Sequence, residues 1–409
     1  MPHSPSWLLP PGTSPDAALI LTARGIRAFT DGYVALLLPY YLTLLGYSAF
    51  QVGAIATATL LGSGLLTLLA GMFAYRYRLH VLLTTACLLM LGTGLGFAMA
   101  TDFLPLLLIA VIGTLNPSSG DVSVFSPLEQ TLLSHAAASA QRTALFSRYS
   151  LVGHLVGALG ALAAAIPGVL AHADVLEIKS AVQLMFVVYG LSALVALALY
   201  RRLASATARG DETRAAPLGA SKGIVYRLAA LFSLDAFAGG FAVQSLLALW
   251  LFQRFDLSVE AAGSIFFWMG LLAAASFLAA PSIARRIGLI NTMVFTHLPA
   301  NIFCVLVPFM PTLPLAILLL SLRALLSSMD VPARSSYVMA VVSPGERPAA
   351  ASVTAVPRSL ASAVSPMIAG YLLTVSTFGW PLVICGSLKI VYDLTLLGMF
   401  RKVKPPEEQ

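Results

Sequence analysis

Charged side chains interrupt the long apolar stretches of this sequence. Seven are basic and six are acidic, so pairing among them could nearly neutralise the set. They are Arg24, Arg27, Asp31, Asp121, Glu129, Arg148, Asp235, Arg323, Asp330, Arg334, Arg358, Lys389 and Asp393. A charge held in hydrocarbon is costly unless it faces a partner or a water-filled cavity, so each position is a candidate for ligand binding or proton transfer.

The first apolar stretch carries Arg24, Arg27 and Asp31, whose spacing places all three on one face of a helix. Asp121 lies at a similar expected depth in the fourth stretch. We expect Asp31 and Asp121 to face each other, or to share Arg27, as an acid pair that binds a proton or a substrate. Asp121 is the favoured proton carrier, because no basic residue lies within a helical turn of it. A bridge between Arg27 and Asp31 within one helix is the alternative.

The segment from Asn116 to Asp121 also contains Pro117 and Gly120, which loosen a helix and free backbone carbonyl groups. Broken polar segments at membrane depth commonly line binding sites, so we expect Asn116 and Asp121 to line a cavity. Glu129 follows near the end of the same stretch. It is interpreted either as part of a gate or as a helix end in contact with water.

Two acid–base pairs in the second half have the spacing of neighbours on one helix face. Asp330 and Arg334 are four residues apart, as are Lys389 and Asp393. We expect both pairs to form ion pairs within their own helices.

Arg358 is a separate case, because its own apolar stretch contains no acidic residue. One interpretation is that Arg358 contacts an anionic group of a substrate. The other is a bridge between helices to Asp235 or Asp330.

Composition sets the class of protein. Of 409 residues, 58% are hydrophobic and only 10% are charged, whereas soluble proteins carry roughly 25% charged residues. The sequence therefore predicts an all-α membrane protein with the lipid bilayer as its surroundings, and the net charge of +7 is attributed to topology and not to nucleic-acid binding. Nucleotide-binding loops, catalytic triads and paired metal ligands are missing, so we expect neither an enzyme nor a metal or other cofactor.

Twelve apolar stretches are long enough to span a membrane. They lie near 18–46, 50–74, 80–101, 103–133, 140–171, 177–200, 223–254, 259–284, 289–311, 313–342, 348–377 and 380–400. This predicts an N-terminal tail at 1–17, a six-helix bundle at 18–200, a linker at 201–222, a second six-helix bundle at 223–400 and a tail at 401–409. No basic leader precedes the first stretch, and we expect no cleaved signal peptide.

The basic residues between these stretches fix the expected orientation. With a cytoplasmic N-terminus, fifteen Lys or Arg residues fall on the inner side and two on the outer side. Because inner loops of membrane proteins are enriched in basic residues, the count predicts a multi-pass protein of a bacterial-type inner (plasma) membrane with both termini cytoplasmic.

The two halves resemble each other. Gly53 and Gly263 are separated by the same 210 residues as Arg76 and Arg286. Two parallel six-helix repeats joined by a basic loop are similar to the architecture of the major facilitator superfamily, and the resemblance covers nearly the whole chain.

The loop signature of that superfamily, G-x-x-x-D-R-x-G-R, is present only in part. Gly71 and Arg76 match it in the first half, and Arg286 and Gly288 match it in the second. The acidic position is Tyr75 in the first copy and a basic residue in the second. In the family this acid contributes to a latch on the cytoplasmic side, so the latch is either absent here or built from other residues.

The resemblance implies a function. It implies alternating-access transport of a small solute by a monomer, with helices 1, 4, 7 and 10 lining the cavity and protons as the expected coupling ion. The fifth helix, with Gly153, Gly157 and Gly160, resembles that of drug antiporters and favours efflux, although close helix packing also accounts for these glycines. A passive facilitator or an uptake permease is the alternative.

Overall fold

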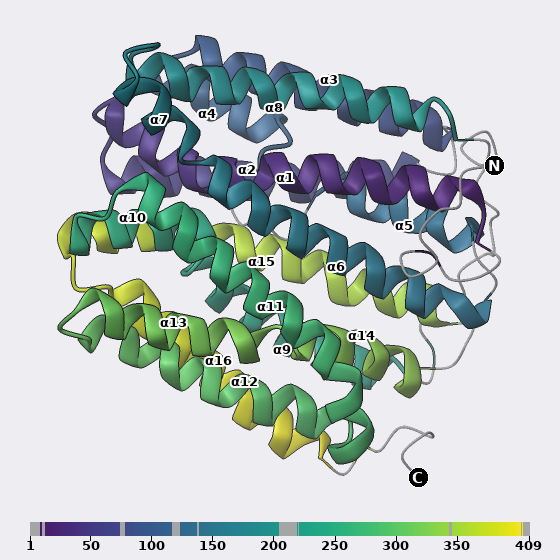
Figure 1. Ribbon diagram of the computed structural model, residues 1–409. Coiled ribbons are helices and arrows are strands. Elements are labelled where there is room, and N and C mark those ends of the chain that lie inside the picture. The colour runs from purple at the N-terminus through teal and green to yellow at the C-terminus, as the bar shows by residue number, and fades with distance from the viewer. Residues whose placement is uncertain are drawn as a thin grey trace. The chain divides into compact units, whose positions relative to one another are not determined.

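A computed structural model describes residues 9, 13–73, 78–116, 123–136, 139–203, 219, 221–342, 346–401 and 403. Within these residues every regular element is a helix (Figure 1). Asp121 and Arg76, together with Pro117 and Gly120, lie outside the described residues.

Eight helical segments lie in the described residues of the first half. They are α1 (Pro15–Leu44), α2 (Ala49–Phe73), α3 (Leu79–Met99), α4 (Phe103–Ile112), α5 (Phe125–Ala136), α6 (Ser139–Ala163), α7 (Ile166–His172) and α8 (Ile178–Tyr200). The second half contains α9 (Lys222–Gly240), α10 (Gln244–Phe255), α11 (Val259–Ile287), α12 (Leu289–Leu306), η2 (Val307–Phe309), α13 (Leu313–Ser327), α14 (Asp330–Val341), α15 (Arg347–Val375) and α16 (Trp380–Phe400).

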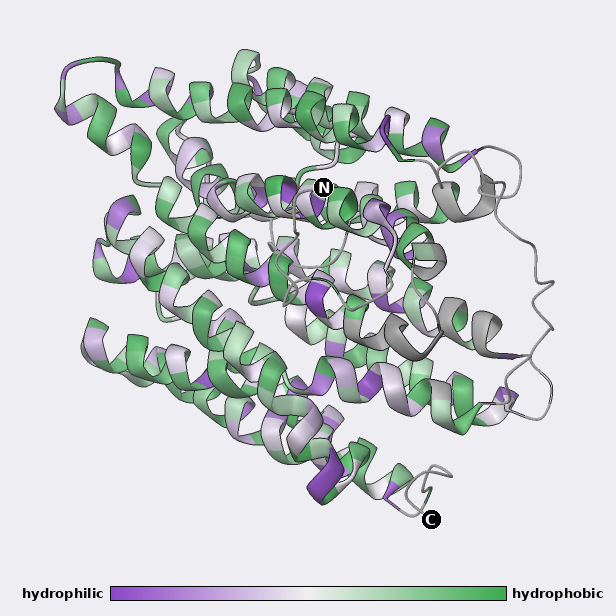
Figure 2. Cartoon of the chain, turned by 45° about the vertical axis from the view of Figure 1, so that its right-hand side comes forward, coloured by the Kyte–Doolittle hydropathy of each residue, from purple (hydrophilic) through white to green (hydrophobic). Residues whose placement is uncertain are grey.

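These segments correspond to the twelve predicted spans. In the described part of the chain, nine stretches are long and apolar enough to cross a membrane. The other three predicted spans correspond to α1, to α4 with α5, and to α15. Their apolar character is interrupted by charges in α1, by the break between α4 and α5, and by several small polar residues in α15. Figure 2 shows the hydrophobic character that most helices share.

Several spans are built from two shorter helices. The tenth span breaks between α13 and α14, and the seventh breaks after Gly240, between α9 and α10. The fourth span is divided between α4, which ends at Ile112, and α5, which begins at Phe125. The break predicted at Pro117 and Gly120 falls on residues that the structure does not describe.

Contacts divide the chain into two compact units. Unit 1 consists of Met1–Tyr47, Ala58–Asp211 and Ser258–Phe267, and unit 2 consists of Ser48–Thr57, Glu212–Leu257 and Trp268–Gln409. Each unit therefore contains a short piece from the other half of the sequence.

In unit 1, α1 packs against α6 and α8, and α3 packs against α8. Gly160 on α6 lies so close to α1 that an added Cβ atom would clash with the carbonyl group of Phe29. Only glycine permits this approach of two backbones. Gly160 therefore has a packing role in this unit.

In unit 2, α9 packs against α15 and α12 packs against α16. A buried apolar cluster that includes Phe232, Met293 and Tyr392 joins α9, α12 and α16. Gly288 separates α11 from α12 with a φ of 84°, a conformation that favours glycine. This explains the glycine that ends the second copy of the loop signature.

Candidate functional site

Glu129 on α5 is the centre of a buried polar cluster in unit 1. Its side chain is ion-paired with Arg27 of α1 and is 0% exposed. The hydroxyl groups of Tyr149 and Tyr200 donate hydrogen bonds to its two carboxylate oxygens, each at 2.5 Å. The ring of Phe125 lies 4.1 Å from the Arg27 guanidinium carbon. One guanidinium and two phenols thus donate to a single carboxylate.

This cluster corrects two expectations. A bridge between Arg27 and Asp31 was one of the two interpretations of α1, but Arg27 pairs with Glu129, 102 residues away. Glu129 as a water-exposed helix end is also wrong, because its side chain is fully buried. The packing of α1 against α5 and α8 explains both corrections. It brings Arg27 and Tyr200 to the carboxylate of Glu129.

Asp31 lies on the same buried face of α1 as Arg24 and Arg27, as its spacing predicted. It is 6% exposed. Among the described residues, none forms an ion pair or a side-chain hydrogen bond with its carboxylate. Arg24 and Arg27 are close enough to interact with it electrostatically, while Arg24 also stacks on the Tyr149 ring at 5.0 Å. The expected encounter with Asp121 falls outside the described residues.

Unit 2 contains a second buried network, formed by Asp235, Asp330, Arg334 and Lys389. The Lys389 ammonium lies 2.6 Å from one oxygen of Asp235. Arg334 lies 3.2 Å from the other oxygen of Asp235 and also pairs with Asp330. The predicted Asp330–Arg334 pair is confirmed. Two cations on α14 and α16 thus neutralise two carboxylates on α9 and α14.

The predicted pair of Lys389 and Asp393 is wrong. Lys389 bonds to Asp235, while Asp393 bonds to His297 at 2.9 Å and to Asn301 at 2.8 Å, both on α12. Both groups on α16 therefore bond to other helices instead of to each other. Sequence reasoning missed His297 and Asn301, although two polar residues four positions apart in an apolar stretch were a usable signal.

Arg358 is exposed on α15, in contrast to the buried charges around it. Its expected bridge would use Asp235 or Asp330, and both of these acids are paired with Arg334 or Lys389. Among the described residues, none forms an ion pair with Arg358. Its guanidinium thus keeps donors that a ligand could use.

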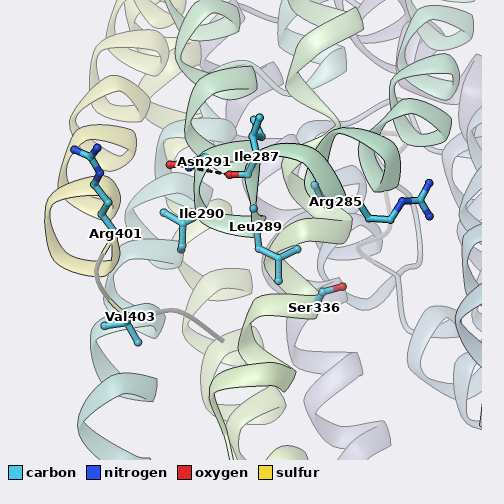
Figure 3. A pocket seen from close by; sticks show the side chains of 10 residues that line it. Arg285, Ile287, Leu289, Ile290, Asn291, Ser336, Arg401 and Val403 are labelled. Carbon is cyan, nitrogen blue, oxygen red and sulfur yellow. Dashed lines mark hydrogen bonds between the residues drawn. The ribbon is translucent and has the colours of Figure 1, made fainter. Parts of the chain in front are cut away.

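A pocket of about 580 Å³ lies where α11 meets α12 (Figure 3). Arg285 and Arg401 belong to its lining, with Gly288 between the two helices. The Asn291 amide donates to the Ile287 carbonyl at 2.8 Å. Arg286 is exposed beside this pocket. In the first copy of the signature, Gly71 belongs to the end of α2.

A larger cavity, of about 800 Å³, lies between α1, α6 and α8 in unit 1. Its lining is mainly aliphatic and aromatic, and includes Phe29. The hydroxyl groups of Thr22, Thr30 and Ser192 also line it, but each donates to a carbonyl of its own helix. The wall therefore offers little to a polar ligand. Asn116, another candidate, is buried in unit 1 beyond the end of α4.

Removing the charge of Glu129 should destabilise unit 1. We expect Glu129→Gln to lower thermal stability by the equivalent of about 3–5 kcal/mol, because it leaves Arg27 charged and unpaired. The measurement is thermal unfolding of the purified protein in detergent.

The matched control is Asp102→Asn, at an exposed acid between α3 and α4. The double variant Arg27→Gln with Glu129→Gln should recover part of the loss. Wild-type stability in Glu129→Gln alone would contradict this account of the cluster.

Comparisons with known proteins agree with the helical architecture. A family profile described as Major Facilitator Superfamily matches residues 20–326. An uncharacterized membrane protein of Saccharomyces cerevisiae is 24% identical over 427 residues, which cover 95% of this chain and 94% of the yeast protein.

Three solved structures share the fold. A variant of the nucleoside transporter NupG has a TM-score of 0.73 at 14% identity, covering 94% of this chain and 100% of its own. A bacterial homologue of the human lysosomal transporter Spinster, in an inward-facing and occupied conformation, has a TM-score of 0.70 at 16% identity, covering 94% and 95%. The human organic anion transporter MFSD10 has a TM-score of 0.63 at 15% identity, covering 96% and 100%.

Solved structures at 14–16% identity show the fold that these chains share. The family profile covers well over half of the sequence, and the same helical fold is found along nearly the whole chain. The chain therefore belongs to the major facilitator superfamily, as a multi-pass membrane transporter of a small solute and not an enzyme.

Proposed function

We propose that this protein, as a monomer, exports a small solute by alternating access in exchange for protons. The observation that carries the proposal is Asp31, a buried carboxylate on α1 without an ion-pair partner among the described residues. A carboxylate at that depth is costly when charged and unpaired. Burial therefore favours the protonated form of Asp31. We expect it to release the proton when alternating access exposes the carboxylate to water.

The neighbours of Asp31 support this role. Arg27 forms its ion pair with Glu129 and not with Asp31. Asp31 can then lose its charge without leaving Arg27 unpaired. Asp121 remains the second proposed coupling acid, on the sequence argument alone. The proposed direction, efflux, is supported by the resemblance of the fifth span to drug antiporters.

Asp31→Asn should abolish solute movement driven by a pH gradient, because asparagine cannot carry the proton. It should retain solute exchange at equal concentrations, which needs no net proton movement. The assay uses inside-out vesicles with a compound panel that includes nucleosides and organic anions, with and without a pH gradient. Asp102→Asn is the control and should behave as wild type.

Full gradient-driven accumulation by Asp31→Asn would move the proton-carrying role to Asp121. Wild-type flux with no response to the gradient in any variant would favour the passive facilitator. Accumulation in right-side-out vesicles instead of inside-out ones would favour the uptake permease.

We propose Arg358 as the contact for an anionic group of the solute. Its exposure on α15 supports this, as does the pairing of Asp235 and Asp330 with other cations. The likeness to a protein described as an organic anion transporter is consistent with such a cargo. Asp235 and Asp330 then hold the surrounding helices in place.

Arg358→Lys should weaken the apparent affinity for solute about tenfold with normal accumulation of protein, because a point charge replaces a planar two-pronged donor. Solute competition in the same vesicles measures this. Unchanged affinity with a loss of folded protein would contradict the binding role and favour a structural one. Lys179→Arg, at an exposed position in the first turn of α8, is the control.

We further propose that two six-helix bundles, 18–200 and 223–400, are joined by a cytoplasmic linker at 201–222, in a bacterial-type inner membrane. The fifteen-to-two distribution of basic residues supports this orientation. The tails 1–17 and 401–409 then both lie in the cytoplasm.

Reporter fusions after Gly210 and after Gln409 should therefore both report a cytoplasmic location, because each follows an even number of spans. A fusion after Asp174, in an expected outer loop, is the control and should report the opposite side. A periplasmic signal at Gly210 or Gln409 would overturn the twelve-span topology.

A further inference from the structure

His297 and Asp393 form a buried acid–base pair inside unit 2, joined by Asn301. Nδ1 of His297 lies 2.9 Å from Oδ1 of Asp393. The amide of Asn301 donates to the other oxygen of Asp393 at 2.8 Å. His297 is 3% exposed and Asp393 is 0% exposed. The pair therefore joins α12 to α16 away from bulk water.

The contact between the two side chains contains one proton. Without it, two lone pairs would face each other at 2.9 Å, which is unfavourable. Asn301 donates to Oδ2, and we assign the proton of the contact to Nδ1, which donates it to Oδ1. The Asn301 amide nitrogen also lies 3.2 Å from Nδ1. The bond at Nδ1 sets the tautomer and leaves Nε2 with its lone pair free to accept a proton.

The surrounding charges leave Asp393 without a fixed cation. Arg334 is bonded to Asp235 and Asp330, and Lys389 is bonded to Asp235. Further ionisable groups on α12, α16 and the helices packed against them include Cys304 on α12, Arg323 on α13, Tyr337 on α14, Arg358 on α15, and Cys385 and Tyr392 on α16. Of these, Tyr392 packs edge-on against the His297 ring at 6.1 Å. Among the residues hydrogen-bonded to Asp393, only His297 can therefore carry a positive charge that neutralises its carboxylate.

We propose that the pair of His297 and Asp393 is a proton-binding site, distinct from the coupling acids of unit 1. A proton from water adds to Nε2 of His297, an N–H bond forms, and the net charge of the pair changes from −1 to 0. Asp393 stabilises the imidazolium through Nδ1, and Asn301 positions Asp393. No co-reactant is needed. A role of this site in transport rests on the proposed function, whereas proton binding itself does not.

The donor set suits a proton better than a metal ion. One imidazole and one carboxylate converge here, and the amide presents its donor side to the carboxylate. Among the described residues, no group of three or more His, Cys, Asp and Glu side chains could hold a metal ion. A site with two ligands and an inward-facing donor is poorly suited to the four or more ligands that metals require.

The test uses full-length protein in lipid vesicles with isotope-labelled histidine. Ring-nitrogen NMR spectra are recorded from about pH 5 to about pH 9, on both sides of the ordinary histidine range. His297→Gln identifies the His297 signal by its loss. We expect that signal to change from the neutral Nδ1-protonated ring to the doubly protonated ring within this range.

Asp393→Asn should suppress that change, because the imidazolium loses its counter-charge. His154→Gln is the matched control. That histidine lies on α6 in unit 1, with Nδ1 2.8 Å from the Ser150 carbonyl oxygen. Its replacement should leave the His297 titration intact. If His297→Gln fails to fold, Asn301→Ser identifies the same signal by its shift while retaining both titrating groups.

A His297 ring that keeps one protonation state across the range, in folded protein, would overturn the proposal. So would an unchanged titration in folded Asp393→Asn. A normal titration together with solute flux that ignores the pH gradient would leave the proton site standing and overturn proton coupling, so the two failures are distinguishable.

Discussion

A charged side chain held among apolar helices needs a neutralising partner, and this constraint organises both units. In unit 1 Arg27 meets Glu129 across 102 residues of sequence, and in unit 2 Lys389 meets Asp235 across 154. Each bond ties together helices that are distant in the chain. Such pairs add little net stability over apolar packing, but loss of one partner leaves the other charged and unpaired. They therefore fix which helices can neighbour each other.

Asp31 and Arg358 are two charged groups that have no ion-pair partner among the described residues. Asp31 is buried beside two arginines without forming an ion pair with a described residue, and Arg358 is exposed while nearby acids are paired elsewhere. Paired groups hold the bundle, whereas groups without a fixed partner can exchange a proton or meet an anion. His297 and Asp393 lie between these two kinds, because their bond forms only with a proton between them.

The sequence predicts much of the fold, since apolar length and helix-breaking residues are local properties. All twelve predicted spans correspond to helices or to pairs of short helices. The Asp330–Arg334 pair follows equally from spacing on one helix. Charge partners across helices do not follow, because spacing only permits a local pair and packing decides whether it forms. Lys389 and Asp393 have the same permissive spacing, yet both groups bond to other helices.

Other features of the site depend on residues that reveal little by themselves. The polar pair of His297 and Asn301 does not reveal its partner, because the carboxylate opposite it, Asp393, lies on another helix. Glu129 suggested a helix end in contact with water because it lies near the end of the fourth apolar stretch. Its carboxylate is buried because the hydroxyl groups of Tyr149 and Tyr200, on two other helices, donate hydrogen bonds to it.

The most direct test of this charge-pairing account is a double-mutant cycle on Lys389 and Asp235. Thermal unfolding of the purified protein would be measured for Lys389→Gln, Asp235→Asn and the double variant. The account predicts that the two losses are strongly non-additive, with a coupling energy of about 0.5–3 kcal/mol, because each single change leaves a buried charge without part of its compensation. Losses that add to within about 0.5 kcal/mol would contradict it.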